Sequence, residues 1–128
     1  MTTDAIETTA AEIQARRVAK QNDQFRKTWG ADFTIPGRIV TTQGVASLPF
    51  AAQVQIMGAV QTFDTFTEDN DPHADHSFGG FEIESEGETV KLFWKIDLYD
   101  RPYRYGSENP ANTAETRRVL TIMQRHEY

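Results

Sequence analysis

The chain has 128 residues, of which 38% are hydrophobic and 25% charged, and these fractions are ordinary for a soluble globular protein. No apolar run approaches the roughly 20 residues that a membrane-spanning helix needs, so we expect no membrane partner. The net charge of −6 argues against direct nucleic-acid binding and favours a protein partner with a basic surface.

At this length we expect a single domain over residues 1–128, with about residues 1–9 as a candidate disordered segment. The N-terminus lacks the basic opening and the apolar stretch of a signal peptide, and the chain contains no cysteine for a disulfide. Both observations favour a cytoplasmic protein of the bacterial type. The sequence does not indicate an oligomeric state.

The first predicted element is a helix from about residue 10 to residue 28. Thr8 or Thr9 can cap it, with Glu12 completing a capping box after Thr9, and Gly30 ends it. Its expected apolar stripe consists of Ile13, Val18, Phe25 and Trp29. The opposite face is basic, and we expect it to be solvated, with a docking surface for an acidic partner as the alternative: Arg16, Arg17, Lys20, Arg26 and Lys27.

A strand is predicted at residues 37–45, which are rich in β-branched side chains. A second helix follows at about residues 48–61, with Ser47 as N-cap and Pro49 in the first turn. Its expected core-facing stripe is Phe50, Val54, Met57 and Val60. Gly58 inside this helix suggests the close approach of another backbone.

The clearest strand signal is the strict alternation of residues 90–99, and residues 81–84 show the same period of two. A hairpin through Glu86 and Gly87 places both apolar sets on one side only if paired residue numbers sum to an odd number. This condition requires a loop of two or four residues and sets Glu82 and Glu84 beside Lys91 or its neighbours.

Asn112 and Glu115 form a second capping-box pattern, which predicts a final helix with Val119, Ile122 and Met123 facing the core. These elements together predict an α+β fold. The expected architecture is a small antiparallel sheet that contains a β-hairpin and packs against N-terminal, middle and C-terminal helices.

The acidic run at residues 67–80 carries four carboxylates and two of the three histidines of the chain. It is not an EF-hand, because Ala74 stands where that motif needs glycine and Gly80 where it needs the bidentate glutamate. A Zn, Mn or Fe site remains an alternative, as does a hydrolase in which His76 acts as a base beside Asp97 or Glu68; the candidate ligands are Asp71, His73, Asp75 and His76. The simplest interpretation is a loop in which Asp and Asn side chains bond their own backbone, with no cofactor.

Four ordered stretches carry a family resemblance: QNDQFR at residues 21–26, FTEDNDP at 66–72 with a following acid-His-x-Phe-Gly, FWKIDLYD at 93–100, and TRRVLTIM at 116–123 with EY at 127–128. Together they resemble a bacterial family of unknown function that is often found on plasmids and other mobile elements. The family pattern has Glu at Asp75, Asp at Ser77 and Tyr at Leu98. The resemblance implies no established activity, but its setting suggests an accessory role in host conflict, such as blocking a restriction or CRISPR complex.

The leading functional hypothesis is a small acidic protein-interaction module. A compact acidic domain can occupy a basic protein surface through complementary potential and a few aromatic anchors. The candidate binding residues are Glu68, Asp69, Asp71, Tyr99, Tyr103 and Tyr105. The glutamates at positions 82, 84, 86 and 88 would extend this surface if they lie on the same side of the protein.

Overall fold

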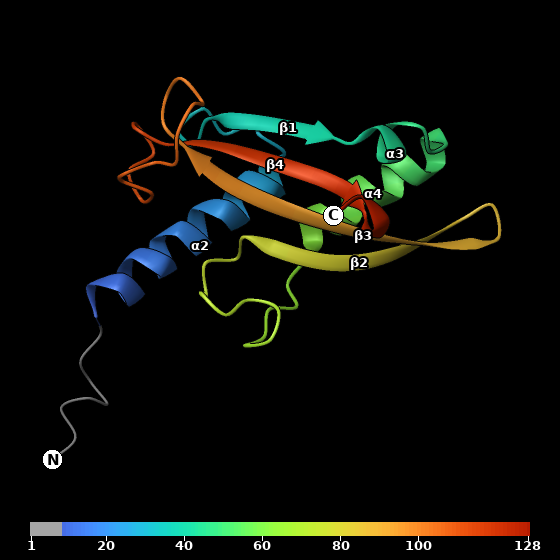
Figure 1. The fold of residues 1–128 in the computed structure, drawn as a ribbon, viewed down its shortest axis with the longest axis horizontal. Coiled ribbons are helices and arrows are strands. Elements are labelled where there is room, and N and C mark those ends of the chain that lie inside the picture. Colours follow the sequence, from blue (N-terminus) through green and yellow to red (C-terminus); the bar gives the residue numbers. More distant parts are fainter. Residues whose placement is uncertain (1–8) are drawn as a thin grey trace, which may run out of the picture.

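The structure, a computed structural model, describes residues 9–128 (Figure 1). Within these residues it has three α-helices, one four-stranded sheet and a 3-10 turn. The elements in chain order are α2 (Ala10–Thr28), β1 (Gly37–Thr41), α3 (Gln43–Ala46), α4 (Phe50–Thr62), β2 (Phe78–Ser85), β3 (Glu88–Tyr99), β4 (Arg117–Gln124) and η1 (Arg125–Glu127). The expectation of disorder at the N-terminus falls on residues that lie outside the described part, apart from Thr9.

The four strands lie in the order β1-β4-β3-β2 (Figure 1). β2 and β4 both run antiparallel to β3, whereas β1 runs parallel to β4. The sheet is therefore mixed, and the expectation of a purely antiparallel sheet is wrong. The parallel pair requires a long connection between β1 and β4, and this connection contains α3, α4 and the β2–β3 hairpin. The α+β class itself is confirmed.

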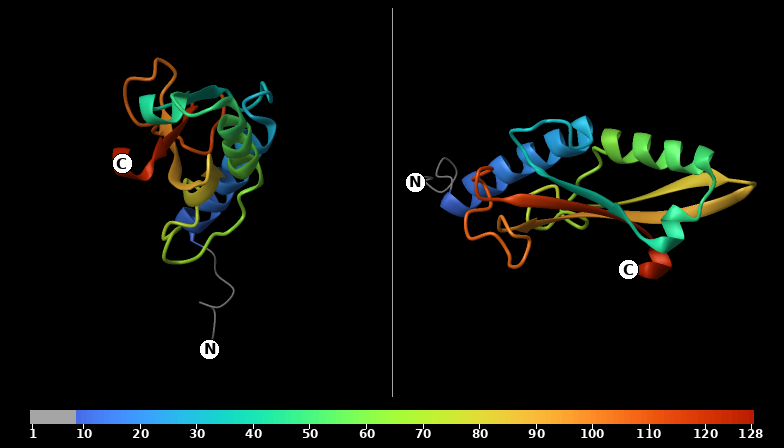
Figure 2. Two further views of the ribbon diagram at one scale, coloured as in Figure 1. Left: turned by 90° about the vertical axis from the view of Figure 1, so that its right-hand side faces the viewer. Right: turned by 90° about the horizontal axis from the view of Figure 1, so that it is seen from above.

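α2 and α4 cover the same face of the sheet, and the core lies between them and the strands (Figure 2). β3 and β4 contribute alternate residues to this core, as the period of two requires. The fully or nearly fully buried apolar side chains include Phe25 of α2, Ile56 and Val60 of α4, Leu92, Trp94 and Ile96 of β3, and Leu120 and Ile122 of β4. None of the described helices is long and apolar enough to cross a membrane.

α2 begins and ends where the sequence predicts. The Thr9 side chain accepts a hydrogen bond from the Glu12 backbone N–H at 3.1 Å, so the predicted cap is formed. Trp29 and Gly30 adopt left-handed conformations that end the helix. One member of the predicted solvated basic face is placed differently, because Arg26 is only 1% exposed and packs against Trp94.

α4 differs from its prediction in its start and in its buried face. Ser47 terminates the short helix α3, and Pro49 is the N-cap of α4. The buried residues are Ala52, Ile56 and Val60. Phe50 and Val54 are 83% and 56% exposed, so three of the four predicted stripe residues face outwards, Met57 being the third. A helix with apolar residues all round does not reveal its buried face by periodicity.

The β2–β3 hairpin follows its predicted register. Phe81 pairs with Leu92 and Glu82 with Lys91, and every pair sums to an odd number. The turn has two residues, Glu86 and Gly87, with φ angles of 53° and 80°. Positive φ at both positions is typical of a type I′ turn, whose twist matches that of the strands.

The predicted C-terminal helix is wrong, because its residues form strand β4 in the centre of the sheet. Asn112, the predicted helix cap, instead stabilises a turn, in which its side chain accepts a hydrogen bond from the Ala114 N–H at 3.0 Å. Leu120 and Ile122 then face the core, while Val119 and Thr121 lie on the opposite face. The predicted strand at residues 37–45 is also shorter, since it ends at Thr41 before α3.

Candidate functional site

The segment between α4 and β2, residues 63–77, is named the acidic loop; it contains most of the acidic run of the sequence. It hangs beside the β2 edge of the sheet, below β2 in the view of Figure 1. Its first residues, 63–66, lie in neither a helix nor a strand. Its acidic side chains differ in their exposure to solvent. Glu68 and Asp69 are exposed, whereas Asp71 is only 9% exposed.

Side-chain to backbone hydrogen bonds shape the acidic loop. Asn70 accepts from the Thr67 N–H at 2.8 Å and donates to the Thr65 carbonyl at 2.9 Å. Asp71 accepts from the His76 N–H at 3.2 Å. The predicted bonding of Asp and Asn side chains to their own backbone is therefore confirmed. It stabilises an unusual chain path in which Ala74 and His76 both have a φ of +54°.

α2 holds the acidic loop from the other side. The His76 ring Nδ1 lies 2.9 Å and 3.0 Å from the two carboxylate oxygens of Asp23, and Asn22 donates to the Asp75 carbonyl at 2.9 Å. The same His76 ring stacks on Phe66 with a centroid separation of 3.8 Å and an angle of 2° between the planes. The His76 ring therefore joins the end of the loop to α2 through Asp23 and to the start of the loop through Phe66.

Arg26 extends this arrangement into the core. Its guanidinium donates to Asp23 at 2.6 Å and to the carbonyl oxygens of Val60 and Phe63 at 2.8 and 3.0 Å. These carbonyls belong to the last turn of α4 and to the residue after it, where helix oxygens lack partners within the helix. The guanidinium also lies over the Trp94 ring, 4.6 Å from its centroid. Burial lowers the pKa of Arg26, and the hydrogen bond that Arg26 donates to Asp23 opposes this shift.

Arg118 of β4 is a second buried arginine that contacts α2. Its Nε donates to Asn22 at 2.7 Å and its Nη2 to Gln21 at 2.9 Å. Burial lowers its pKa to about 10. Asn22 also donates to the Asp75 carbonyl, so it connects this arginine of β4 to the acidic loop.

The predicted metal ligands do not form one group. Asp71 and His76 are neighbours, with His76 Nε2 3.8 Å from an Asp71 oxygen, and Asp75 accepts from the Ser77 hydroxyl at 2.7 Å. His73 is exposed and lines a cleft together with Asp71 and Asp75, whereas His76 does not line it. Across residues 9–128, no three His, Asp or Glu side chains are arranged to hold a metal ion.

His76, the predicted base, is paired with carboxylates other than the predicted Asp97 and Glu68. His76 contacts Asp23 and Asp71, whereas Asp97 lies on the other face of the sheet and pairs with Lys95 at 3.1 Å. Glu68 is exposed to solvent. The bonds of His76 thus connect the acidic loop to α2.

A cleft of about 320 Å³ runs along the acidic loop. Three carboxylates and two aromatic rings line it, and its lining contains no lysine or arginine; the residues are Asp69, Asn70, Asp71, Pro72, His73, Asp75, Ser77, Phe78 and Tyr128. Tyr128 is 75% exposed and packs edge-on against Phe78 at a centroid distance of 5.8 Å. This cleft combines negative charge with aromatic walls.

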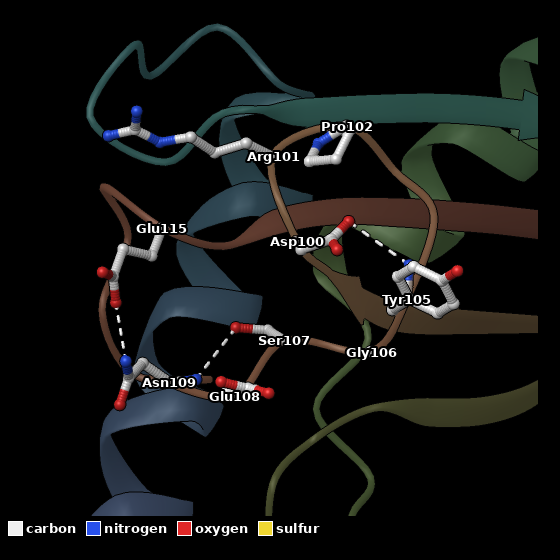
Figure 3. A pocket seen from close by; sticks show the side chains of 9 residues that line it. All are labelled: Asp100, Arg101, Pro102, Tyr105, Gly106, Ser107, Glu108, Asn109 and Glu115. Carbon is white, nitrogen blue, oxygen red and sulfur yellow. Dashed lines mark hydrogen bonds between the residues drawn. The ribbon is translucent and has the colours of Figure 1, made fainter.

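The predicted tyrosine anchors lie elsewhere, at the end of β3 and in the loop that follows it. Tyr103 stacks against Arg38, whose guanidinium carbon is 3.9 Å from the ring centroid. Tyr105 is 72% exposed and lines a second cavity of about 630 Å³ (Figure 3). Asp100 holds this loop by accepting from the Arg104 N–H at 2.9 Å. Tyr99, Tyr103 and Tyr105 do not line the acidic cleft.

The glutamates of the hairpin do not extend the acidic surface either. Glu82 and Glu84 lie on the sheet face away from the helices, and Glu86 and Glu88 lie at the hairpin tip. This tip projects from the opposite end of the sheet (Figure 1). The carboxylates of the acidic loop and the glutamates of the hairpin therefore lie in separate parts of the protein.

Residues 41–127 match a family described as "Protein of unknown function (DUF3768)". The chain belongs to this family. The matched residues include the acidic loop and strands β2 to β4, and the Asn22, Asp23 and Arg26 contacts of α2 lie outside them. No curated protein and no solved structure matches the chain.

Sequence reasoning missed Asp23, Arg26, Phe78 and Tyr128 as residues of this site. Asp23 and Arg26 belong to a stretch that carries the family resemblance, and their spacing of three puts them on one helix face. This spacing indicates from the sequence alone that the two side chains can interact. Phe78 and Tyr128 come from the start of β2 and from beyond β4, so their proximity depends on the sheet order.

Proposed function

We propose that this DUF3768 protein is a small acidic protein-interaction module whose cleft receives a cationic side chain from a basic surface of a partner protein. The observation that carries the proposal is the lining of the cleft, where Asp69, Asp71 and Asp75 lie with the rings of Phe78 and Tyr128. Carboxylates and aromatic faces are the two groups that attract a guanidinium or ammonium ion.

The fixed shape of the acidic loop supports this proposal. Binding costs less when the groups that make the contact are already ordered. The loop is bonded to itself through Asn70 and Asp71 and to α2 through His76 and Asn22. Its exposed acids, Glu68 and Asp69, are therefore presented on an ordered backbone.

Protein surfaces that hold nucleic acid are rich in Lys and Arg, and they suit such a module. The proposal accordingly includes an accessory role for a bacterial mobile element, of the anti-restriction or anti-CRISPR type, in the cytoplasm. This part rests on the resemblance of the sequence motifs. It predicts that nucleic acid and this protein compete for the same surface of the partner.

A titration followed by amide chemical shifts tests the cleft directly. The probe is a blocked Gly-Gly-Arg-Gly-Gly peptide, and the control is the same peptide with citrulline, which keeps the shape of arginine without its charge. We expect shifts centred on residues 69–78 and Tyr128 with the arginine peptide only. Equal shifts with both peptides, or shifts centred on the hairpin glutamates, would contradict the proposal.

A further inference from the structure

The outer face of α4 is an apolar surface that residues 9–128 leave uncovered. Phe50 and Val54 are 83% and 56% exposed, and Met57 is 38% exposed. Apart from the neighbouring residues and the backbone of its own helix, a Cβ added at Gly58 would meet no atom of the described residues within 4 Å. The prediction that another backbone approaches Gly58 is therefore wrong within the described chain. The residues at positions 50, 54 and 58 recur every four residues, so they share one helix face.

This face also carries no charge. The sequence has no Asp, Glu, Lys or Arg between Arg38 and Asp64, a stretch that includes all of α4. Two copies of a protein with a net charge of −6 repel each other, so a contact between identical copies needs a surface without like charges. α4 provides such a surface, and it lies on the helix side of the sheet (Figure 2).

The side chains on this face are complementary to a second copy of themselves. In a symmetric antiparallel pair of helices that cross at Val54, residue 50 of one copy lies opposite residue 58 of the other. The Phe50 ring then fits over Gly58, where a Cβ is absent and the space is open. The two Val54 side chains meet at the symmetry axis. Large residues placed against small ones let two helix surfaces interlock.

We propose that the protein forms a weak symmetric dimer through the outer face of α4, with Val54 at the axis and Phe50 of each copy over Gly58 of the other. One helix pair buries a small area, so the dimer forms at high protein concentration. This proposal is independent of the acidic cleft, whose residues lie in the loop after α4, on β2 and at Tyr128.

Sedimentation equilibrium at protein concentrations up to about 1 mM tests the dimer. We expect the wild-type protein to dimerise and Val54→Glu to raise the dissociation constant at least ~10-fold, because it places two carboxylates together. Gln43→Glu on α3 is the matched control, since it changes the charge equally on an exposed residue outside the contact. A monomeric wild-type protein, or a Val54→Glu dimer of unchanged affinity, overturns the proposal.

Gly58→Leu separates the contact from the fold. Leucine favours a helix more than glycine does, and a Cβ at this position meets no described atom outside its own helix, so the variant should have a raised melting temperature. The same leucine occupies the place of the Phe50 ring and should weaken dimerisation at least ~10-fold. Gly58→Leu protein with unchanged dimerisation overturns the proposed crossing.

Cysteine pairs test the register, because the chain has no cysteine of its own. Under mild oxidation we expect Val54→Cys to cross-link to itself. Phe50→Cys and Gly58→Cys chains should cross-link when mixed and much less when each is alone. Gln43→Cys is the background control. Cross-linking at the background rate in all three tests overturns the register.

Discussion

The Nδ1 atom of His76 lies 2.9 Å from Oδ1 of Asp23, although 53 residues separate the two along the chain. This contact joins the acidic loop to α2. Because the same Asp23 oxygen also accepts from Arg26 at 2.6 Å, one carboxylate oxygen connects the loop to the buried arginine that holds the end of α4. The loop that carries the exposed acids is thus connected to the core through His76, Asp23 and Arg26.

Removing the ring of His76 should loosen the acidic loop. His76→Ala loses the hydrogen bond to Asp23 and the stack on Phe66, which together should cost about 1–3 kcal/mol of unfolding free energy. Backbone amide exchange should accelerate at Asp71 and Ala74, whose N–H groups bond within the loop. His73→Ala, at an exposed histidine of the same loop, is the control and should change neither quantity. Equal exchange rates in the two variants would show that the His76 contacts do not hold the loop.

Replacing Arg26 should destabilise the whole fold. Arg26→Ala leaves Asp23 without its closest cation and the Val60 and Phe63 carbonyls without a donor, so we expect a loss of about 3–5 kcal/mol. Lys27→Ala, at the adjacent exposed position, should cost less than about 0.5 kcal/mol. Denaturant unfolding measures both. A loss for Arg26→Ala as small as that of the control would mean that the buried guanidinium contributes nothing to stability.

Two adjacent glycines of β2 should respond differently to alanine. A Cβ at Gly79 would lie 2.7 Å from Phe63 Cζ and collide with the buried Trp94 indole, so Gly79→Ala should cost about 1–3 kcal/mol or more. A Cβ at Gly80 points to the other face and comes within 3.1 Å of the half-buried Phe93 ring. Gly80→Ala should therefore cost less. Thermal unfolding of the pair measures the difference, and the reverse order would place Gly79 outside the core.

Glu127 should make stability depend on pH in the acid range. The Thr42 hydroxyl at 2.6 Å and the backbone N–H groups of Gln124 and Gly44 donate to its carboxylate and lower its pKa. The pKa is lower in the folded than in the unfolded state, so its contribution is complete above the ordinary value of a glutamate and disappears as pH falls through the lowered value. Glu127→Gln should therefore be less stable than the wild type at pH 7, with a gap that narrows in acid. Exposed Glu88→Gln is the control. A gap that stays constant over the acid range would contradict this account.

The parts of the fold that the sequence predicts well have strong local causes. α2 has a cap at Thr9 and a left-handed end at Trp29, and the β2–β3 hairpin has a two-residue turn at Glu86 and Gly87. Both elements form within short stretches of the chain. The α+β class follows from these elements together.

The wrong predictions concern segments whose structure depends on contacts with distant parts of the sequence. Val119, Ile122 and Met123 suit a helix by spacing, but β1 and β3 each pair with this segment, and both partners lie far away in sequence. The central position gives β4 hydrogen-bond partners on both edges, which outweighs a local helical pattern. The same limit applies to α4, since only the packed structure shows that Ile56 is inside and Val54 outside.

Of the predicted binding residues, Asp69 and Asp71 line the candidate cleft, whereas Glu68 and the three tyrosines do not. The acidic run indicated the loop, and the Asp and Asn contacts with the backbone follow the usual behaviour of these residues. Asp71 was grouped with Glu68 and Asp69 as a binding residue, yet it is nearly buried and bonded to His76. The presence of three acidic residues close together in the sequence does not indicate which of them is buried.

The most direct test of the central claim compares two charge reversals with the arginine peptide as ligand. Glu68→Lys/Asp69→Lys changes the exposed acids of the loop and leaves the bonded Asp71 intact, whereas Glu86→Lys/Glu88→Lys changes the hairpin tip. Each pair brings the net charge from −6 to −2, so long-range attraction is matched. If the acidic loop is the binding site, the loop pair weakens binding at least ~10-fold and the hairpin pair at most ~3-fold. Equal weakening by both pairs, or a larger effect of the hairpin pair, would contradict it.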